Sequence, residues 1–313
     1  MSSTGLVIVA GRVLIPYSTG LVTIAGQVLT NAVAISAGLS HGLALKADGT
    51  VVGWGNNMSG RAVGVETGST NGLVMVDGRI LNNVSAISAC QYSLALQSNG
   101  AVVVWGRDGS GKPILIPDDF SNALSVAAGE SYSLALKKDG TITTATSVGT
   151  KFKPIEFSNV VAVATATKNA VQRNLGLKQD GTVVVWNDNN GILDTCRGLS
   201  NIVAIAAGAN HHLALKNDGT VVEWGWVRNS ETNVPVGLTN VVAIAASKAD
   251  VMGYNGFSLA LKNDGTVVAW GKFSNQQPVN VPVGLSNVVA IAAGDDFCLA
   301  ITTNRAVAER FRH

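Results

Sequence analysis

Short apolar runs alternate with polar turn segments along the chain, and residues 201–225 show this pattern most completely. The run 203–207 has the length of a buried strand, and residues 213–216 alternate as a strand with one buried face does. The pair Asp218-Gly219 separates them from the β-branched and aromatic segment 220–224. Because glycine adopts positive φ freely, this pair predicts a two-residue primed hairpin turn. The segment therefore predicts three antiparallel strands.

The three-strand pattern recurs along the whole chain. Each copy begins with an Asn and an Ala-rich apolar run, at Asn31, Asn83, Asn122, Asn159, Asn201, Asn240 and Asn287. A turn pair follows in six copies, at Asp48, Asn99, Asp139, Asp180, Asp218 and Asp264, and five copies then carry a Trp, at Trp54, Trp105, Trp186, Trp224 and Trp270. Repeats of this length predict a solenoid or a propeller, and we expect the Trp side chains to pack between repeats.

The two ends of the chain complement each other. Residues 287–313 have room for inner strands only, whereas residues 1–30 contain hairpin patterns that precede the first Asn. Pairing of the two ends would remove the exposed strand edges. We therefore predict an all-β, seven-bladed β-propeller in a single domain of residues 1–313. Its blades are 31–82, 83–121, 122–158, 159–200, 201–239 and 240–286, with a closing blade made from 287–313 and 1–30; an eighth blade near the N-terminus stays an alternative.

The repeat unit resembles that of the regulator-of-chromosome-condensation family, whose consensus reads like GxxHSLALKxDGTVVxWG. The resemblance is carried by GLSHGLALKADGTVVGWG at 38–55 and GANHHLALKNDGTVVEWG at 208–225. It extends over about residues 31–313 and implies a seven-bladed propeller. Short versions of this kind are also similar to the propeller-type β-lactamase inhibitor of soil bacteria, which implies that one face binds a protein.

Strand direction separates the repeats into two faces. The turn pairs, such as Asp218-Gly219, lie on one face, which we call the turn face. The loops before each second strand, such as 208–210, and the loops after each Trp lie on the other, which we call the loop face. Because loops on a rigid scaffold concentrate binding residues, we expect a protein-binding surface on the loop face. Two insertions, 165–173 and 247–257, are expected to rise from the same rim.

Large side chains on the loop face are the candidate partner-binding residues. One set precedes the second strand of each repeat and is expected to ring the channel mouth; these ring residues are His41, Tyr92, Tyr132, Arg173, His211, Phe257 and Phe297. A second set lies in the loops after Trp and in the second insertion: Arg107, Trp226, Arg228, Lys248, Met252, Tyr254 and Phe273. Aromatic and Arg side chains dominate protein hot spots. The alternative interpretation is that the ring residues fill the channel and pack between blades.

Composition and motifs exclude several other classes. Charged residues are 13% of the chain and the net charge is +2, without the basic stripe that nucleic-acid binding needs. We expect a monomer with no signal peptide, no membrane span, no metal and no cofactor. The histidines His41, His211, His212 and His313 lack metal-ligand spacing. The GxxxxGK match at 106–112 is followed by Pro113 instead of Ser or Thr and a helix, so it does not predict a phosphate loop.

Three functions remain. The preferred hypothesis is a non-catalytic module that presents the loop face to a partner protein, with inhibition of an enzyme as one version. The alternatives are a guanine-nucleotide exchange factor for a small GTPase, which the family resemblance implies, and a lectin or enzyme with a ligand in the central channel.

Overall fold

The computed structural model describes residues 5–11, 20–66, 69–108, 110–117, 120–130, 132–146, 157–168, 171–187, 192–195, 199–225, 233–248, 256–274, 277–304 and 306. The structure in these ranges is almost entirely β, with a 3-10 helix η1 at Met58–Gly60. Within them, no helix has the length and apolar character needed to cross a membrane.

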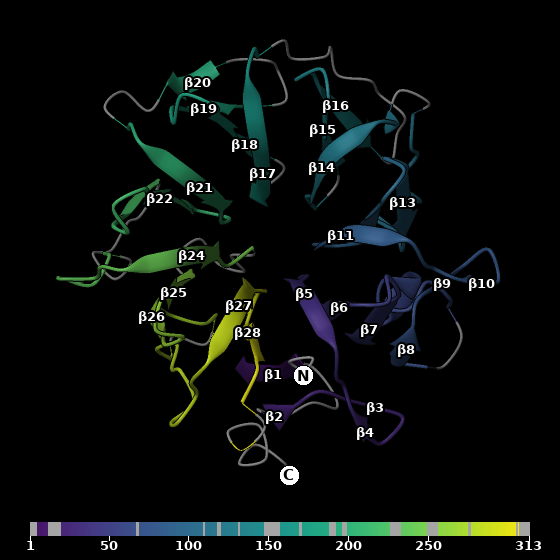
Figure 1. Cartoon of the computed structure of the whole chain (residues 1–313). Helices are drawn as coiled ribbons and strands as arrows, with labels where there is room; N and C mark the ends of the chain where they lie inside the picture. Colours follow the sequence, from purple (N-terminus) through teal and green to yellow (C-terminus); the bar gives the residue numbers. More distant parts are fainter. Residues whose placement is uncertain are drawn as a thin grey trace.

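Seven sheets of three or four strands, formed by the described residues, surround a common centre (Figure 1). Their innermost strands are β5 (Ala32–Ala37), β11 (Val84–Ala89), β14 (Ala123–Ala128), β17 (Val160–Lys168), β21 (Ile202–Ala207), β24 (Val241–Ala246) and β27 (Val288–Ala293). The second strands are β6 (His41–Lys46), β12 (Ser93–Gln97), β15 (Tyr132–Lys137), β18 (Val171–Lys178), β22 (His211–Lys216), β25 (Phe257–Lys262) and β28 (Phe297–Thr302).

The outer strands complete the sheets. The third strands are β7 (Val51–Gly55), β13 (Val102–Trp105), β16 (Ile142–Thr146), β19 (Val183–Trp186), β23 (Val221–Gly225) and β26 (Val267–Gly271), and the fourth strands are β8 (Asn71–Leu73) and β20 (Ile192–Thr195). In the last sheet, β1 (Leu6–Gly11) and β2 (Gly20–Leu21) take the outer places. Two hairpins stand apart, β3 (Thr23–Ile24) with β4 (Gln27–Val28) and β9 (Met75–Val76) with β10 (Arg79–Ile80).

The ends of the chain meet in one sheet. Strand β1 pairs antiparallel with β28, from Leu6 opposite Thr302 to Gly11 opposite Phe297. Val7 is 0% exposed at this junction. The expected pairing of the N-terminal strand with the C-terminal repeat is therefore confirmed, and Figure 1 shows β1 beside β28.

Each repeat begins with a left-handed Asn and turns at a left-handed Gly. All seven repeat-opening Asn residues have positive φ, from 52° to 63°, a conformation that Asn tolerates better than most side chains. The expected two-residue primed turn is wrong, because only the Gly has positive φ. In the fifth repeat, Gly219 N–H donates to Lys216 O and Lys216 N–H donates to Thr220 O, which makes a three-residue turn.

The turn Gly also joins neighbouring sheets. Val241 N–H donates to Gly219 O at 3.1 Å, and the same bond recurs at Gly49, Gly100, Gly181 and Gly265. A Cβ on Gly219 would lie 3.1 Å from Asn240 N, so this approach also requires glycine. The Trp side chains of the third strands are mostly buried, as expected for packing between repeats. At most 7% is exposed in Trp54, Trp105, Trp186 and Trp270, and Trp224 is half-buried.

Candidate functional site

The ring residues lie between the sheets instead of around the channel mouth. His41, Tyr92, Tyr132, His211, Phe257 and Phe297 are each at most 3% exposed. None of the six lines the central cavity. Their burial corresponds to the alternative interpretation, in which they pack between repeats. The seventh, Arg173, lies in β18, and its side chain is outside the described residues.

Four ring residues hydrogen-bond to one equivalent position of the next sheet. In each case the partner is the residue that follows the ring residue of the next sheet in the sequence. The pairs are His41 with Ser93 (2.8 Å), Tyr92 with Ser133 (2.6 Å), Tyr132 with Asn174, and His211 with Ser258 (2.9 Å). The two apolar ring residues pack in apolar clusters. Phe257 belongs to a cluster that includes Cys298, and Phe297 belongs to one that includes Trp54. These contacts join neighbouring sheets at the loop face, as the Gly bonds do at the turn face.

The hydrogen bonds of Ser93 fix the protonation of His41. Ser93 Oγ donates to Arg61 O at 2.7 Å, so His41 Nε2 must be the donor in the 2.8 Å bond to Ser93 Oγ. Burial, together with the positive charges of Arg61 and Lys248, lowers the pKa of His41 to about 3. Burial lowers the pKa of His211 to about 4. Both imidazoles are neutral connectors of sheets.

A glycine three positions earlier makes room for four of the ring side chains, those of His41, Tyr132, His211 and Phe297. A Cβ on Gly38 would lie 2.5 Å from His41 Cε1, and one on Gly294 would lie 2.5 Å from Phe297 Cε1. A Cβ on Gly129 would lie 3.1 Å from Tyr132 Cε1, and one on Gly208 would lie 2.9 Å from His211 Cε1. The Gly-x-x spacing in the repeat therefore reflects packing of the ring side chain against its own loop.

The candidate partner-binding residue Phe273 is buried instead of presented on the loop face. Phe273 is 9% exposed and packs edge-on against Phe257, with ring centroids 5.2 Å apart. It lies two residues after the end of β26, and its backbone N–H donates to Gln277 O at 2.9 Å, so the backbone of these two residues comes together. Phe273 belongs to the core of this loop.

Arg107 lies on the loop face, with its side chain 41% exposed. Its Nε is 3.0 Å from Glu66 Oε1, which connects the loops of the first two sheets. The neighbouring Asp108 accepts bonds from the backbone N–H of Ser110 and Lys112, at 2.9 and 2.8 Å. The GxxxxGK match is thus a tight turn organised by a carboxylate, which is unsuited to holding a phosphate.

The remaining candidates fall in part outside the described residues. Trp226, Arg228, Met252 and Tyr254 all lie outside them. The 165–173 insertion is not a separate loop, because its described residues extend the hairpin of β17 and β18, with Thr165 opposite Asn174 and Lys168 opposite Val171. Strand β17 has 9 residues, whereas the other innermost strands have 6.

The innermost strands enclose a central cavity of about 230 Å³. Most of its lining is Ala, Val and Ile, and its polar members are Ser36, Ser88, Thr165 and Lys248. Lys248 comes from the loop after β24, and its Nζ donates to Ala89 O on β11, across the ring. Burial lowers the pKa of Lys248. The sequence pointed to Lys248 as a loop-face residue but not to its place in the channel.

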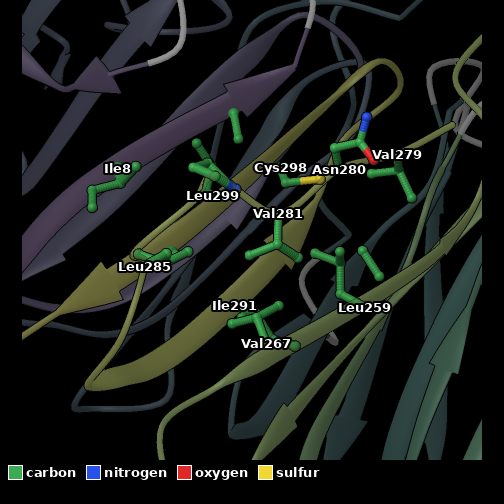
Figure 2. Close-up of a pocket in the computed structure, with 14 residues that line it drawn as sticks. Ile8, Leu259, Val267, Val279, Asn280, Val281, Leu285, Ile291, Cys298 and Leu299 are labelled. Atoms are coloured by element: carbon green, nitrogen blue, oxygen red, sulfur yellow. The ribbon is translucent and has the colours of Figure 1, made fainter. Parts of the chain in front are cut away.

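A second gap lies between the last two sheets. Leu259 and Val267 line it from the sixth sheet, and Ile8, Ile291 and Leu299 line it from the last sheet (Figure 2). Its volume is about 20 Å³, close to that of one water, and its lining is almost wholly apolar. This gap is a packing defect of the core. Among the described residues, no group of three or more His, Cys, Asp or Glu side chains could hold a metal ion.

Comparisons with known proteins agree with this geometry. The regulator of chromosome condensation (RCC1) repeat matches residues 32–61 and 202–231, which hold the first three strands of the first sheet and the three strands of the fifth. Yeast RCC1 (Prp20), solved bound to Kap60, superposes with a TM-score of 0.68 at 17% identity, over 99% of this chain and 92% of that one. Human WBSCR16 superposes with a TM-score of 0.64 at 17% identity, over 95% of this chain and 99% of that one.

A plant receptor shares the same arrangement. The CRINKLY ectodomain of the Arabidopsis thaliana receptor kinase ACR4 superposes with a TM-score of 0.59 at 19% identity, over 84% of this chain and 90% of that one. The fold is therefore that of an RCC1-like β-propeller. The chain itself carries RCC1 repeats, as its sequence predicted. The likeness to the propeller-type β-lactamase inhibitor stays a prediction.

Proposed function

We propose that this protein is a non-catalytic binding module that presents its loop face to a partner protein. The observation that carries the proposal is the contrast between its two faces. On the turn face, five Asp residues make the same two bonds, each accepting from the N–H (2.9–3.0 Å) and the hydroxyl (2.6 Å) of the Thr two residues on. Such uniformity is typical of scaffold.

The loop face differs from one repeat to the next. The first loop contains η1 and exposes Met58 by 67%, the second contains the Asp108 turn, and the sixth folds back through Phe273. The β17–β18 hairpin is three residues longer than its neighbours, which corresponds to about 10 Å of extended strand. A rigid ring with individual loops on one side suits recognition of a protein surface.

The proposal includes the architecture that supports this face. Each of the seven sheets is taken as one blade, with the boundaries that the sequence predicts, so that the ring has seven blades. The bonds from Val84 N–H to Gly49 O and from His41 to Ser93 support this assignment, because each joins consecutive sheets.

Trimming the long hairpin tests the proposal. Residues 167–172 are replaced by Asn-Gly, which suits a two-residue hairpin turn between Ala166 and Arg173. Proteins captured from a lysate of the source organism are quantified with wild type, the trimmed variant and a turn-face control, Lys138→Glu. We expect at least one protein to be captured by wild type and control and lost with the trimmed variant. Equal capture by all three, or capture lost only with Lys138→Glu, would contradict the proposal.

Yeast RCC1 has been solved with Kap60, and the described binding of Prp20p is to Gsp1p and histones. These partners make a protein ligand reasonable for this chain. The guanine-nucleotide exchange hypothesis gains no further support from them, because identity of 17% or 18% establishes a shared fold only.

A further inference from the structure

One end of the central cavity gathers hydrogen-bond donors around Ala89. The Lys248 ammonium donates to Ala89 O, and Ser36 Oγ accepts from Ala89 N–H at 2.9 Å. The adjacent Ser88 Oγ accepts from Ala128 N–H, also at 2.9 Å. Ser36, Ser88 and Lys248 all line the cavity. Residues of three sheets and one loop therefore place these polar groups at neighbouring positions on the cavity wall, next to Ala89.

The donors at this point exceed the acceptors. An ammonium has three protons and a serine hydroxyl has one. Ala89 O takes one proton of Lys248, and within the described ranges neither serine hydroxyl proton has an acceptor and no carboxylate pairs with Lys248. Ser36 is buried, whereas Ser88 and Lys248 are half-buried, and a donor shielded from water is costly unless it is hydrogen-bonded. The site is therefore complementary to a small anion.

Lys248 is held in place by its backbone. Its N–H donates to Gly294 O at 3.2 Å, and the preceding Ser247 N–H donates to Phe257 O at 3.0 Å. Two acidic residues, Glu130 and Asp295, lie close enough to Cys90 to raise its pKa, but neither lines the cavity. The Cys90 thiol has its pKa raised to about 11 by burial, so it stays neutral and does not compete as an anion.

The rest of the cavity determines the size and polarity of the remaining part of the ligand. Away from Ala89 the walls are aliphatic, with Ile35, Val126, Val163, Ile244 and Ile291 among them. A volume of about 230 Å³ corresponds to roughly eight waters at ~30 Å³ each. This space accommodates a short hydrocarbon chain and not a peptide segment.

We propose that the central channel binds a monocarboxylate with a short aliphatic tail. The carboxylate accepts from Lys248 Nζ and from the Ser36 and Ser88 hydroxyls, and the tail lies against the aliphatic walls. One cation matches a singly charged head, whereas a phosphate dianion would leave charge uncompensated in a largely apolar space. This site is independent of the loop-face proposal and can hold or fail on its own.

Isothermal titration with hexanoate tests the site. We expect saturable binding by wild type, at least tenfold weaker binding by Lys248→Met, and several-fold weaker binding by Ser88→Ala. Lys138→Met, a change at an exposed lysine of the turn face, is expected to bind like wild type. Hexan-1-ol, hexylamine and inorganic phosphate separate the contributions of head and tail, and each is expected to bind at least tenfold more weakly.

Three results would overturn the assignment: no saturable hexanoate binding by wild type, equal binding by Lys248→Met, or phosphate or hexan-1-ol binding as tightly as hexanoate. Melting curves of every variant show whether the fold is intact. If Lys248→Met does not fold, Lys248→Arg and Ser88→Ala decide the question, with Arg expected to retain binding and Ala to weaken it. Loss of binding with Arg but not with Ala would contradict the proposal.

Discussion

His41 Nε2 lies 2.8 Å from Ser93 Oγ, and this hydrogen bond joins the second strands of two neighbouring sheets. His41 is 1% exposed and Ser93 is 0% exposed. Equivalent pairs join three further sheet junctions. A side chain that the sequence presents as a surface candidate is thus an internal connector, and the predictions below follow from that role.

Removing the Ser93 hydroxyl should destabilise the fold. Ser93→Ala leaves the buried His41 Nε2 donor and the Arg61 carbonyl without partners, and each unsatisfied group costs about 1–3 kcal/mol. We expect the free energy of unfolding to fall by about 2–6 kcal/mol in urea titrations. The double variant His41→Phe/Ser93→Ala imitates the sheet junctions at which the ring residue is Phe257 or Phe297. We expect it to recover part of this loss. A double variant as unstable as the sum of the single changes would contradict the coupling.

The free energy of unfolding should fall as the pH drops below the pKa of histidine in the unfolded chain. The folded-state pKa values of His41 and His211 are about 3 and about 4, whereas unfolded histidine titrates near 6.5. Their contribution is complete above about pH 6.5 and is lost as the unfolded chain takes up protons, from there down to about pH 4 for His211 and about pH 3 for His41. Each histidine contributes a slope of up to about 1.4 kcal/mol per pH unit.

Urea unfolding between pH 7 and 5 measures this slope, above the range in which the carboxylates titrate. His211→Gln, which removes one titrating group, is expected to halve the histidine part of the slope. An unchanged slope in that variant would show that His211 is not held neutral by the fold.

Phe273 and Met58 should respond in opposite ways to truncation. Phe273 is 9% exposed and packs on Phe257, so Phe273→Ala is expected to cost about 3–5 kcal/mol. Met58 is 67% exposed, and Met58→Ala should change stability by less than about 0.5 kcal/mol. Thermal unfolding compares the two, and equal melting temperatures would place Phe273 at the surface.

Closure of the ring depends on β1. Val7 is 0% exposed and sits opposite Ile301 in the β1–β28 ladder. Val7→Asp buries an unpaired carboxylate, so we expect severe destabilisation or release of β1 with exposure of the β28 edge. Light scattering and limited proteolysis read out both effects, with Thr23→Asp, in the separate β3–β4 hairpin, as the control. A stable, monomeric Val7→Asp protein would contradict the role of β1 in closure.

Most of the fold could be predicted from local patterns. Alternating segments such as 213–216, a left-handed Asn201 and a turn Gly219 are properties of single repeats, so the strands were predictable. The pairing of β1 with β28 also followed, because unpaired edges are unfavourable. The turn type could not be predicted, because the sequence Asp218-Gly219 does not distinguish a two-residue loop from a three-residue loop.

The candidate site was harder to predict, because contacts between repeats depend on how sheets are placed. Nothing local to His41 indicates that its partner is Ser93, 52 positions away. The pattern contained a signal, however: Ser93, Ser133 and Ser258 each follow a ring residue, a polar position next to a large side chain. Lys248 was recognised from its loop, but its entry into the channel depends on Ala89 of a distant strand.

The central claim, that the loop face binds a partner protein, is tested most directly by hydrogen exchange of the protein with and without its captured partner. We predict slower exchange of backbone amides in the β17–β18 hairpin and in the loop around Arg107, with no change at turns such as 216–220. Slower exchange confined to those turns, with the loop-face amides unaffected, would contradict the account.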